Sequence, residues 1–150
     1  MGELTCFVPD VYTYASFQPR YDSNGKVFIN AIAGDTLTAK TPVGVIYNEY
    51  GAVTLALADT TLYYRVGVPI AGAAADASVW LQHGGYITDV VTASITTVVG
   101  YGIEIHDGTV ALVSADYSGV DAEFAVCTEA SGASTTHELM LVPRLILSSS

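Results

Sequence analysis

Basic residues are scarce in this sequence. Five lysines and arginines stand against fifteen aspartates and glutamates, which gives a formal net charge of −10. Nucleic-acid binding needs Lys and Arg to neutralise phosphates, and anionic membrane surfaces attract basic segments. The composition therefore predicts neither a nucleic-acid partner nor a membrane partner. It suits a protein that stays soluble with few charges, or one that docks on a basic partner.

Cysteines and long apolar runs are also few. Cys6 and Cys127 are the only cysteines, and no CxxC motif occurs. We expect two free thiols, with a single bridge from the N-terminal arm to the late strands as the alternative. The longest run of low polarity, residues 66–75, contains Pro69 and is too short to span a bilayer. No basic segment followed by an apolar one marks a secretory signal after Met1, so we expect a chain that is made in the cytoplasm and is soluble there.

Sequence motifs for catalysis and metal binding are absent. The sequence lacks a GxSxG elbow, a phosphate-binding Gly-rich loop and an HExxH motif. Glu104 and His106 share one face of a predicted strand, but a metal site needs three or four converging ligands, and His83 and His137 lie far away in the sequence. We therefore predict a protein that is not an enzyme and that has no cofactor and no metal site.

Short β-prone runs separated by turn residues make up most of the chain. Hydrophobic residues form 51% of the sequence and glycine occurs 14 times. Val, Thr, Ile and Tyr favour strands, and short strands at regular spacing are typical of a barrel or sandwich. The runs expected to form strands are 27–32, 43–47, 52–57, 62–68, 79–82, 86–91, 94–99, 99–105, 109–113, 122–128 and 137–147. A polar loop is expected at 131–136, before the last strand.

The fold class that follows is all-β. We predict a small β-barrel or β-sandwich of short antiparallel strands with an extended N-terminal arm. At most one short helix is expected, and the Ala-rich segment 71–77 is its only candidate. The domain organisation is an arm over 1–25, a β-domain over 26–147 and a frayed C-terminus over 148–150, which a chain of 150 residues accommodates as one domain.

The stretch 73–91 holds the only tryptophan, Trp80. Gly84-Gly85 separates two β-prone runs there, which predicts a hairpin with His83 at its exposed loop. No ligand set or nucleophile lies nearby in the sequence. We therefore predict that Trp80 anchors the core, and a sugar-stacking role is the alternative.

The arm 1–25 is punctuated by prolines and by a turn at 22–25, with aromatic residues between them. Such an arm either packs along its own domain or reaches a neighbouring subunit. From their position in the arm or the predicted loop, the candidate interface residues are Phe7, Tyr12, Tyr14, Phe17, Tyr21 and His83.

Several of these segments together resemble one protein family. They are AGDTL at 33–37, VGVPI at 66–70, VWLQHGG at 79–85, VGYGIE at 99–104 and GTVALV at 108–113. The pattern is similar to that of head-decoration, or cement, proteins of tailed bacteriophages, and it covers roughly residues 34–113. Pro69 departs from the family's small strand residue, and neither 63–65 nor the tail after 116 has a counterpart.

The resemblance implies a β-barrel that binds the outside of an icosahedral head, often as a trimer, and clamps neighbouring capsid subunits. The partners would be the major capsid protein and further copies of this chain, in a virion assembled in the host cytoplasm, without cofactor or catalysis. Two alternatives stay open. One is another β-rich virion component, of the tail, the head–tail junction or a fibre, and the other is a carbohydrate-binding or small hydrolytic β-domain.

Overall fold

The computed structural model describes residues 19–49, 51–56, 65–106, 109–114 and 123–143. All regular structure in these residues is β, and none of them forms a helix, so the predicted all-β class is confirmed. Accordingly, this part of the chain contains no helix of the length and hydropathy needed to cross a membrane. The strands are β1 (Arg20–Tyr21), β2 (Val27–Ile32), β3 (Val43–Asn48), β4 (Gly51–Leu55), β5 (Arg65–Pro69), β6 (Ser78–Thr97), β7 (Gly102–His106), β8 (Thr109–Ser114), β9 (Glu123–Cys127) and β10 (Ser131–Leu141).

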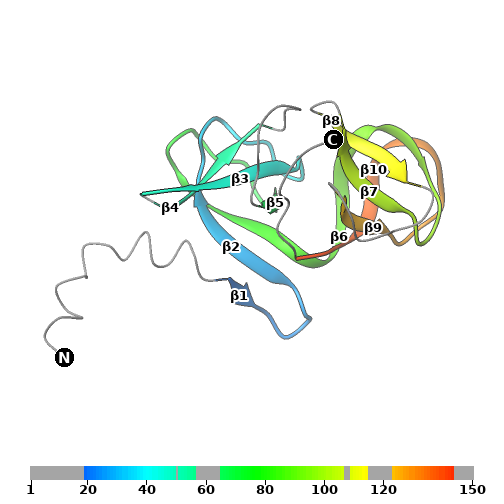
Figure 1. Cartoon of the computed structure of the whole chain (residues 1–150), viewed down its shortest axis with the longest axis horizontal. Coiled ribbons are helices and arrows are strands. Elements are labelled where there is room, and N and C mark those ends of the chain that lie inside the picture. The colour runs from blue at the N-terminus through cyan, green and yellow to red at the C-terminus, as the bar shows by residue number, and fades with distance from the viewer. Residues whose placement is uncertain (1–18, 50, 57–64, 107–108, 115–122, 144–150) are drawn as a thin grey trace, which may run out of the picture.

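Five strands close into a small barrel in the order β2-β4-β3-β5-β6, because β6 pairs back onto β2. The pairing of β2 with β4 is parallel, through Ile32 and Val53, and the other pairings in the barrel are antiparallel. The predicted antiparallel barrel is therefore correct except at this seam. Figure 1 shows β2, β3, β4 and β5 grouped on one side of the molecule.

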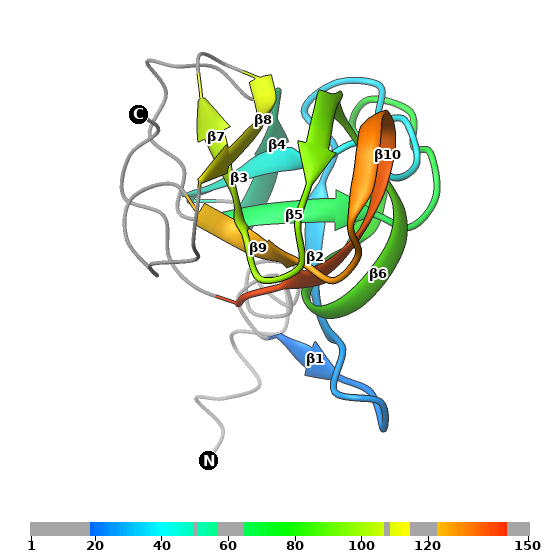
Figure 2. The same cartoon turned by 90° about the vertical axis from the view of Figure 1, so that its right-hand side faces the viewer.

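A second sheet also contains β6. Its order is β6-β10-β9-β7-β8, and all of its pairings are antiparallel. The first half of β6 belongs to the barrel and the second half belongs to this sheet, so one strand joins the two layers. Figures 1 and 2 show β6 curving from the barrel toward β10, with β7, β8 and β9 beyond it.

Each layer has its own apolar core. The barrel is filled by alternate residues of its strands, as the burial of Val27, Ile29 and Ala31 on β2 illustrates. The members of this first core are Ile29, Ala31, Ala33, Leu37, Val43, Val45, Ala52, Val79 and Leu81. The second core joins two side chains of β5 to the second sheet, and its members are Val66, Val68, Ile87, Val90, Ile103, Phe124, Ala125, Cys127, Leu139 and Leu141.

The predicted hairpin at Gly84-Gly85 is wrong. Residues 78–97 form one continuous strand, and the two halves pair with other strands instead of with each other. Phe28 faces Gln82 on the barrel side, whereas Met140 faces Tyr86 beyond the glycines. Glycines permit a bend within a strand as readily as a hairpin turn. Which of the two forms depends on pairing with strands that are distant in the sequence.

The helix considered for 71–77 does not form. This segment lies extended along residues 33–37, where Leu37 and Ala73 form a β-bridge with N–O distances of 2.8 and 3.1 Å. At its end the Asp76 N–H donates to Ala33 O at 2.8 Å, with Asp76 at a φ of 65°. A left-handed residue and backbone bonds to another segment are incompatible with a helix.

The polar loop expected at 131–136 is wrong as well. These residues begin β10, which pairs with β6 through three register shifts. Residues 132, 133, 135 and 136 stay exposed, but the Ser131 hydroxyl takes part in a half-buried polar network. The His137 ring lies between Ser131 Oγ, at 3.2 Å, and Ser134 O, at 2.9 Å, and Ser131 Oγ is also 2.9 Å from Thr97 Oγ1. Irregular pairing with satisfied side chains explains why a Ser/Thr-rich run can be a strand.

Other sequence predictions match the structure closely. The strand at 27–32 has its predicted bounds, and the predicted runs at 99–105 and 109–113, on either side of Asp107-Gly108, contain β7 and β8, which pair with each other. The dipeptide itself lies outside the described residues. The predicted turn at 22–25 is present, with Asp22 Oδ1 accepting the N–H groups of Asn24 and Lys26 at 2.9 and 2.8 Å.

The described part of the N-terminal arm begins at Pro19. Arg20 and Tyr21 form β1, which pairs with Phe28 and Val27 of β2. Residues 1–18, the 57–64 part of two predicted strands, and 144–150 lie outside the described residues. β1 and the start of β2 extend away from the barrel in Figure 1.

Candidate functional site

The bend in β6 is built around its two glycines. Gly85 has a φ of +88°, and a Cβ at this position would lie 2.9 Å from the Lys26 Cα. A Cβ on Gly84 would lie 2.9 Å from Val27 Cγ2. Both contacts are shorter than packed carbon atoms allow, so the strand can press against the start of β2 only with glycine at these positions.

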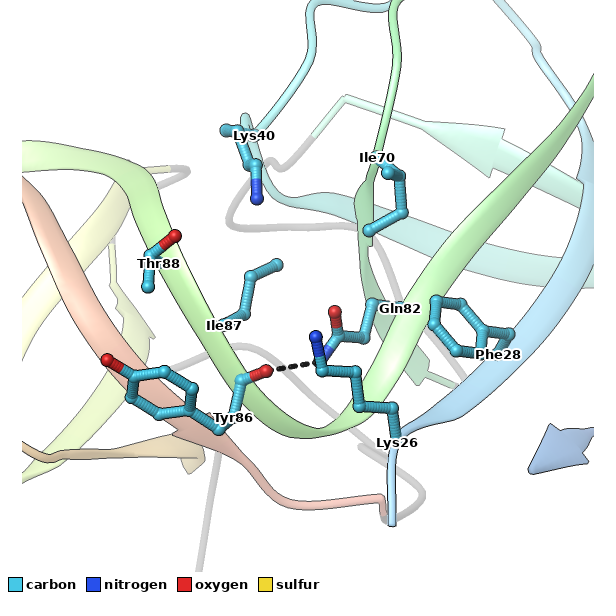
Figure 3. Close-up of a pocket in the computed structure, with 8 residues that line it drawn as sticks. All are labelled: Lys26, Phe28, Lys40, Ile70, Gln82, Tyr86, Ile87 and Thr88. Carbon is cyan, nitrogen blue, oxygen red and sulfur yellow. Dashed lines mark hydrogen bonds between the residues drawn. The ribbon is translucent and has the colours of Figure 1, made fainter. Parts of the chain in front are cut away.

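Gln82 satisfies the backbone at this bend. Its Nε2 donates to Gly84 O at 3.1 Å and to Tyr86 O at 2.9 Å, as Figure 3 shows for Tyr86. The side chain is 1% exposed, so its amide nitrogen meets its need for hydrogen bonds through these two carbonyl groups. Its amide oxygen accepts no hydrogen bond from the described residues, and Figure 3 shows that oxygen directed toward the open space above the strand.

A groove of about 220 Å³ lies at this bend. Side chains from the barrel, from the loops beside it and from both halves of β6 line it (Figure 3). They are Lys26, Phe28, Lys40, Ile70, Gln82, Tyr86, Ile87 and Thr88. The groove thus combines apolar walls with two ammonium groups and lies where the two layers meet.

The two lysines are held at the groove by backbone contacts. Lys40 has a φ of 65°, its N–H donates to Pro69 O at 2.8 Å, and its carbonyl oxygen accepts from Val91 N at 2.9 Å. Lys26 packs its Cα on Gly85 and donates its N–H to Asp22. Neither ammonium group forms an ion pair with any residue that the structure describes.

An exposed aromatic face adjoins the groove. Trp80 is 43% exposed, so the prediction that it anchors the core is wrong. On β6 the side chains of Val79 and Leu81 already point into the barrel, and strand alternation turns Trp80 to the other face. The Arg20 guanidinium lies 5.8 Å from the Trp80 ring centroid, which is cation–π geometry. Tyr21 beside it is 73% exposed.

The exposed aromatic face reaches the groove through neighbouring strands. Phe28 lies opposite both Arg20 of β1 and Gln82 of β6, so it lines the groove and borders the face around Trp80. On the other side of the groove, Tyr86 and its partner Met140 are 40% and 42% exposed. Exposed large apolar side chains that adjoin in this way are typical of contact surfaces between proteins.

Acidic residues flank the Tyr86 end of the groove. Tyr86 donates its hydroxyl proton to Glu138, and this hydrogen bond, with lesser effects of burial and of the charges on Glu138, Glu129 and Asp89, raises the pKa of Tyr86.

The predicted interface residues fall into three groups. Phe7, Tyr12, Tyr14 and Phe17 lie outside the described residues. Tyr21 is exposed on β1 beside the aromatic face. His83 is 3% exposed within β6, so the exposed loop on which its prediction depended does not exist.

His83 instead forms part of the interior. Its Nδ1 lies 2.9 Å from Val66 O. Burial of the ring, followed by the charge of Arg65, lowers the pKa of His83, although the hydrogen bond to Val66 opposes this. Trp80 and His83 point to opposite faces of β6, so the converging pair that a sugar site would use does not form.

Within the described residues, no group of three or more His, Cys, Asp or Glu side chains could hold a metal ion. Cys127 is buried and free, and burial raises the pKa of its thiol. Cys6 lies outside the described residues. What the described arrangement offers is a contact surface with a charged groove.

Sequence reasoning did not find the groove. The scarcity of basic residues could have marked Lys26 and Lys40, since two of the five converge there. Their meeting depends on the bend of β6 and on the left-handed backbone of Lys40, and neither feature is evident in the sequence.

Comparisons with known proteins show a similarity at the level of structure. No protein family and no curated protein matches this sequence. Among solved structures, the chain is similar to the N base of the head fiber gp8.5 of bacteriophage phi29, with a TM-score of 0.52 and 14% sequence identity. The match covers 81% of this chain and 98% of the head fiber base.

The two chains share a fold. Because almost all of the head fiber base is covered, the likeness spans most of the architecture and is not limited to one hairpin or a few strands. At 14% identity it carries the fold alone, and no residue of the groove or the aromatic face is transferred from it.

Proposed function

We propose that this protein is a structural component of a bacteriophage virion that attaches to the outer surface of the head. The supporting observation is the fold shared with a phage head fiber base over 98% of that base. The resemblance of residues 34–113 to head-decoration proteins comes from separate evidence, the sequence alone, and leads to the same surface. Fold likeness by itself raises the prior for a function, so the proposal needs a direct test.

In its specific form the proposal is capsid cementing. The protein would bind the major capsid protein as a homotrimer during assembly in the host cytoplasm and hold neighbouring subunits together without catalysing a reaction. The exposed side chains of Trp80, Tyr21 and Met140 offer apolar contact area for such binding. A trimer that engages several subunits multiplies weak contacts, so no single site needs high affinity.

The second candidate is the base of a head fibre, and the structural neighbour specifically favours it. A fibre base also attaches to the head, but its task is to carry a further protein outward. The two roles differ in what binding does to the capsid: a cement stabilises the shell, whereas a fibre base need not.

The test uses capsids from the phage that encodes this chain, produced without the protein. Purified full-length protein is added, and cosedimentation measures bound copies per capsid while calorimetry follows capsid melting. Light scattering of the free protein measures its mass against that of a trimer. We expect saturable binding, a raised capsid melting temperature and a trimeric mass.

The outcomes separate the two roles. Saturation at a few copies per capsid without a change in capsid melting would favour the fibre base over the cement. Absence of binding to capsids at any protein concentration up to tens of micromolar would contradict attachment to the head in either form.

A further inference from the structure

We propose that the groove at the bend of β6 receives an extended segment of the capsid protein that carries a carboxylate next to apolar side chains. This inference rests on the proposed attachment to the head, and it names the chemistry of the partner at one site.

Charge is the first argument. The chain carries −10 overall, yet two of its five basic side chains, Lys26 and Lys40, line one groove and pair with no acidic group among the described residues. An ammonium group in an acidic protein has many possible internal partners. Two unpaired ammonium groups that line one groove from different sides (Figure 3) leave a local positive site suited to an anionic group.

The rigidity of the lysine backbones is the second argument. Lys40 is held in the left-handed region, at a φ of 65°, by hydrogen bonds to Pro69 and Val91 from the two layers. Non-glycine residues in this region gather at ligand clamps, where the surrounding structure maintains the strain. Lys26 is pressed against Gly85, so both ammonium groups extend from fixed points.

The other residues that line the groove favour a peptide over a bare anion as its ligand. Phe28, Ile70 and Ile87 supply apolar walls, which an inorganic ion would not use. Gln82 is 1% exposed, and its amide oxygen is directed into the groove without a donor among the described residues (Figure 3). That oxygen can accept a backbone N–H from an extended segment, while the lysines bind a carboxylate on the same segment.

The experiment compares capsid binding by variants of equal net charge. The test variant is Lys26→Gln with Lys40→Gln, and its matched control is Ser94→Glu with Thr96→Glu, two exposed positions beyond the bend of β6. Both double variants are two charge units more negative than the wild type. We expect the lysine variant to bind capsids about tenfold more weakly or worse, and the control to stay within about twofold of the wild type.

A second variant covers the case in which the lysine variant fails to fold. Ile70 is an exposed wall residue, so Ile70→Glu places a carboxylate in the groove with little effect on the core. We expect it to weaken binding, whereas Thr96→Glu alone, at the same net charge, does not. Circular dichroism and thermal melting verify that each variant is folded.

The two proposals fail differently. Wild-type protein that does not bind capsids contradicts the attachment itself. Wild-type protein that binds, with the lysine variant and Ile70→Glu binding equally well, overturns the groove inference and leaves the attachment intact.

Discussion

His83 is a titratable side chain placed inside the fold, opposite to its predicted position in an exposed loop. Trp80, three residues earlier, was predicted inside and is exposed. Residue type alone favours burying the tryptophan, but the alternation of β6 gives the interior to Val79 and Leu81. Side-chain polarity could not reveal this, because the strands with which β6 pairs determine which of its alternate residues face the core.

The burial of His83 predicts acid-sensitive stability. Its pKa is lowered in the folded state from 6.5, so below about pH 6.5 the unfolded chain binds more protons than the native one. The free energy of unfolding therefore falls as the pH drops from about 6.5 toward the folded pKa, by at most about 1.4 kcal/mol per pH unit from this group.

Urea titrations at about pH 8 and about pH 5 measure this effect. His83→Gln keeps a donor for Val66 O but does not titrate, so we expect a smaller loss of stability in acid for the variant than for the wild type. Carboxylates titrate in both proteins and cancel in the comparison. Equal acid sensitivity of the two proteins would contradict the assignment.

Cys127 predicts slow thiol chemistry. It is 1% exposed and burial raises its pKa, so little reactive thiolate is present at neutral pH. In a Cys6→Ser variant, which leaves Cys127 as the only thiol, we expect an aromatic disulfide reagent to react at least about tenfold more slowly with the native protein than with the urea-unfolded protein. Equally fast reaction in both states would show that Cys127 is accessible.

The strands themselves were largely predictable, whereas the bend of β6 was not. A β-prone run bounded by turn residues is a local signal, and it located 27–32 with its correct bounds. Gly84-Gly85 is compatible with a hairpin and with a bend, and the choice depends on β2 and β10, each about 50 residues away in the sequence. Local pattern carries no information on such pairings.

Three glycines allow the requirements of the bend to be separated. Gly85 combines a φ of +88° with a close approach of Lys26, Gly100 has the same φ with open space around it, and Gly132 has neither constraint. We expect Gly85→Ala to destabilise by about 2–4 kcal/mol, Gly100→Ala by about 1 kcal/mol, and Gly132→Ala by less than about 0.5 kcal/mol.

Chemical denaturation of the three alanine variants gives these values directly. The order of the three losses in stability is the critical result, since it separates the cost of the left-handed backbone from the cost of the steric contact. If Gly85→Ala were no more harmful than Gly100→Ala, the contact with Lys26 would not be a constraint, and the bend would need only a left-handed residue.

Across the whole molecule, two cores depend on one strand. Leu81 lies in the barrel core and Leu139 in the second core, and both are fully buried. Because β6 contributes to both layers, we expect them to unfold together. Leu81→Ala and Leu139→Ala should each cost about 2–5 kcal/mol and shift one common transition.

Calorimetry tests this expectation through the ratio of calorimetric to van't Hoff enthalpy, which should stay near one in both variants. Met140→Ala is a matched control, since Met140 adjoins Leu139 on β10 but is exposed, and it should change stability by less than about 1 kcal/mol. A separate early transition in Leu139→Ala, with the barrel melting unchanged, would show two independent units.

At this scale the predicted fold class is confirmed, whereas four of the six predicted interface residues lie outside the described residues. An all-β barrel follows from composition and strand spacing, both of which the sequence displays. The groove arises where residues 26, 28, 40, 70, 82 and 86–88 meet in space, through the bend of β6 and the left-handed backbone of Lys40. These are properties of long-range pairing, so composition could suggest a docking protein without locating its docking site.

The position of β6 in the chain also sets an order for synthesis. The barrel cannot close until Ser78–Thr97 has left the ribosome, since the pairing of this strand with β2 completes it. The second half of β6 remains an unpaired strand edge until Ser131–Leu141 has been synthesised. During that interval its unpaired backbone groups are available to another nascent copy, which makes the time between these two strands the period when the growing chain is most open to mispairing.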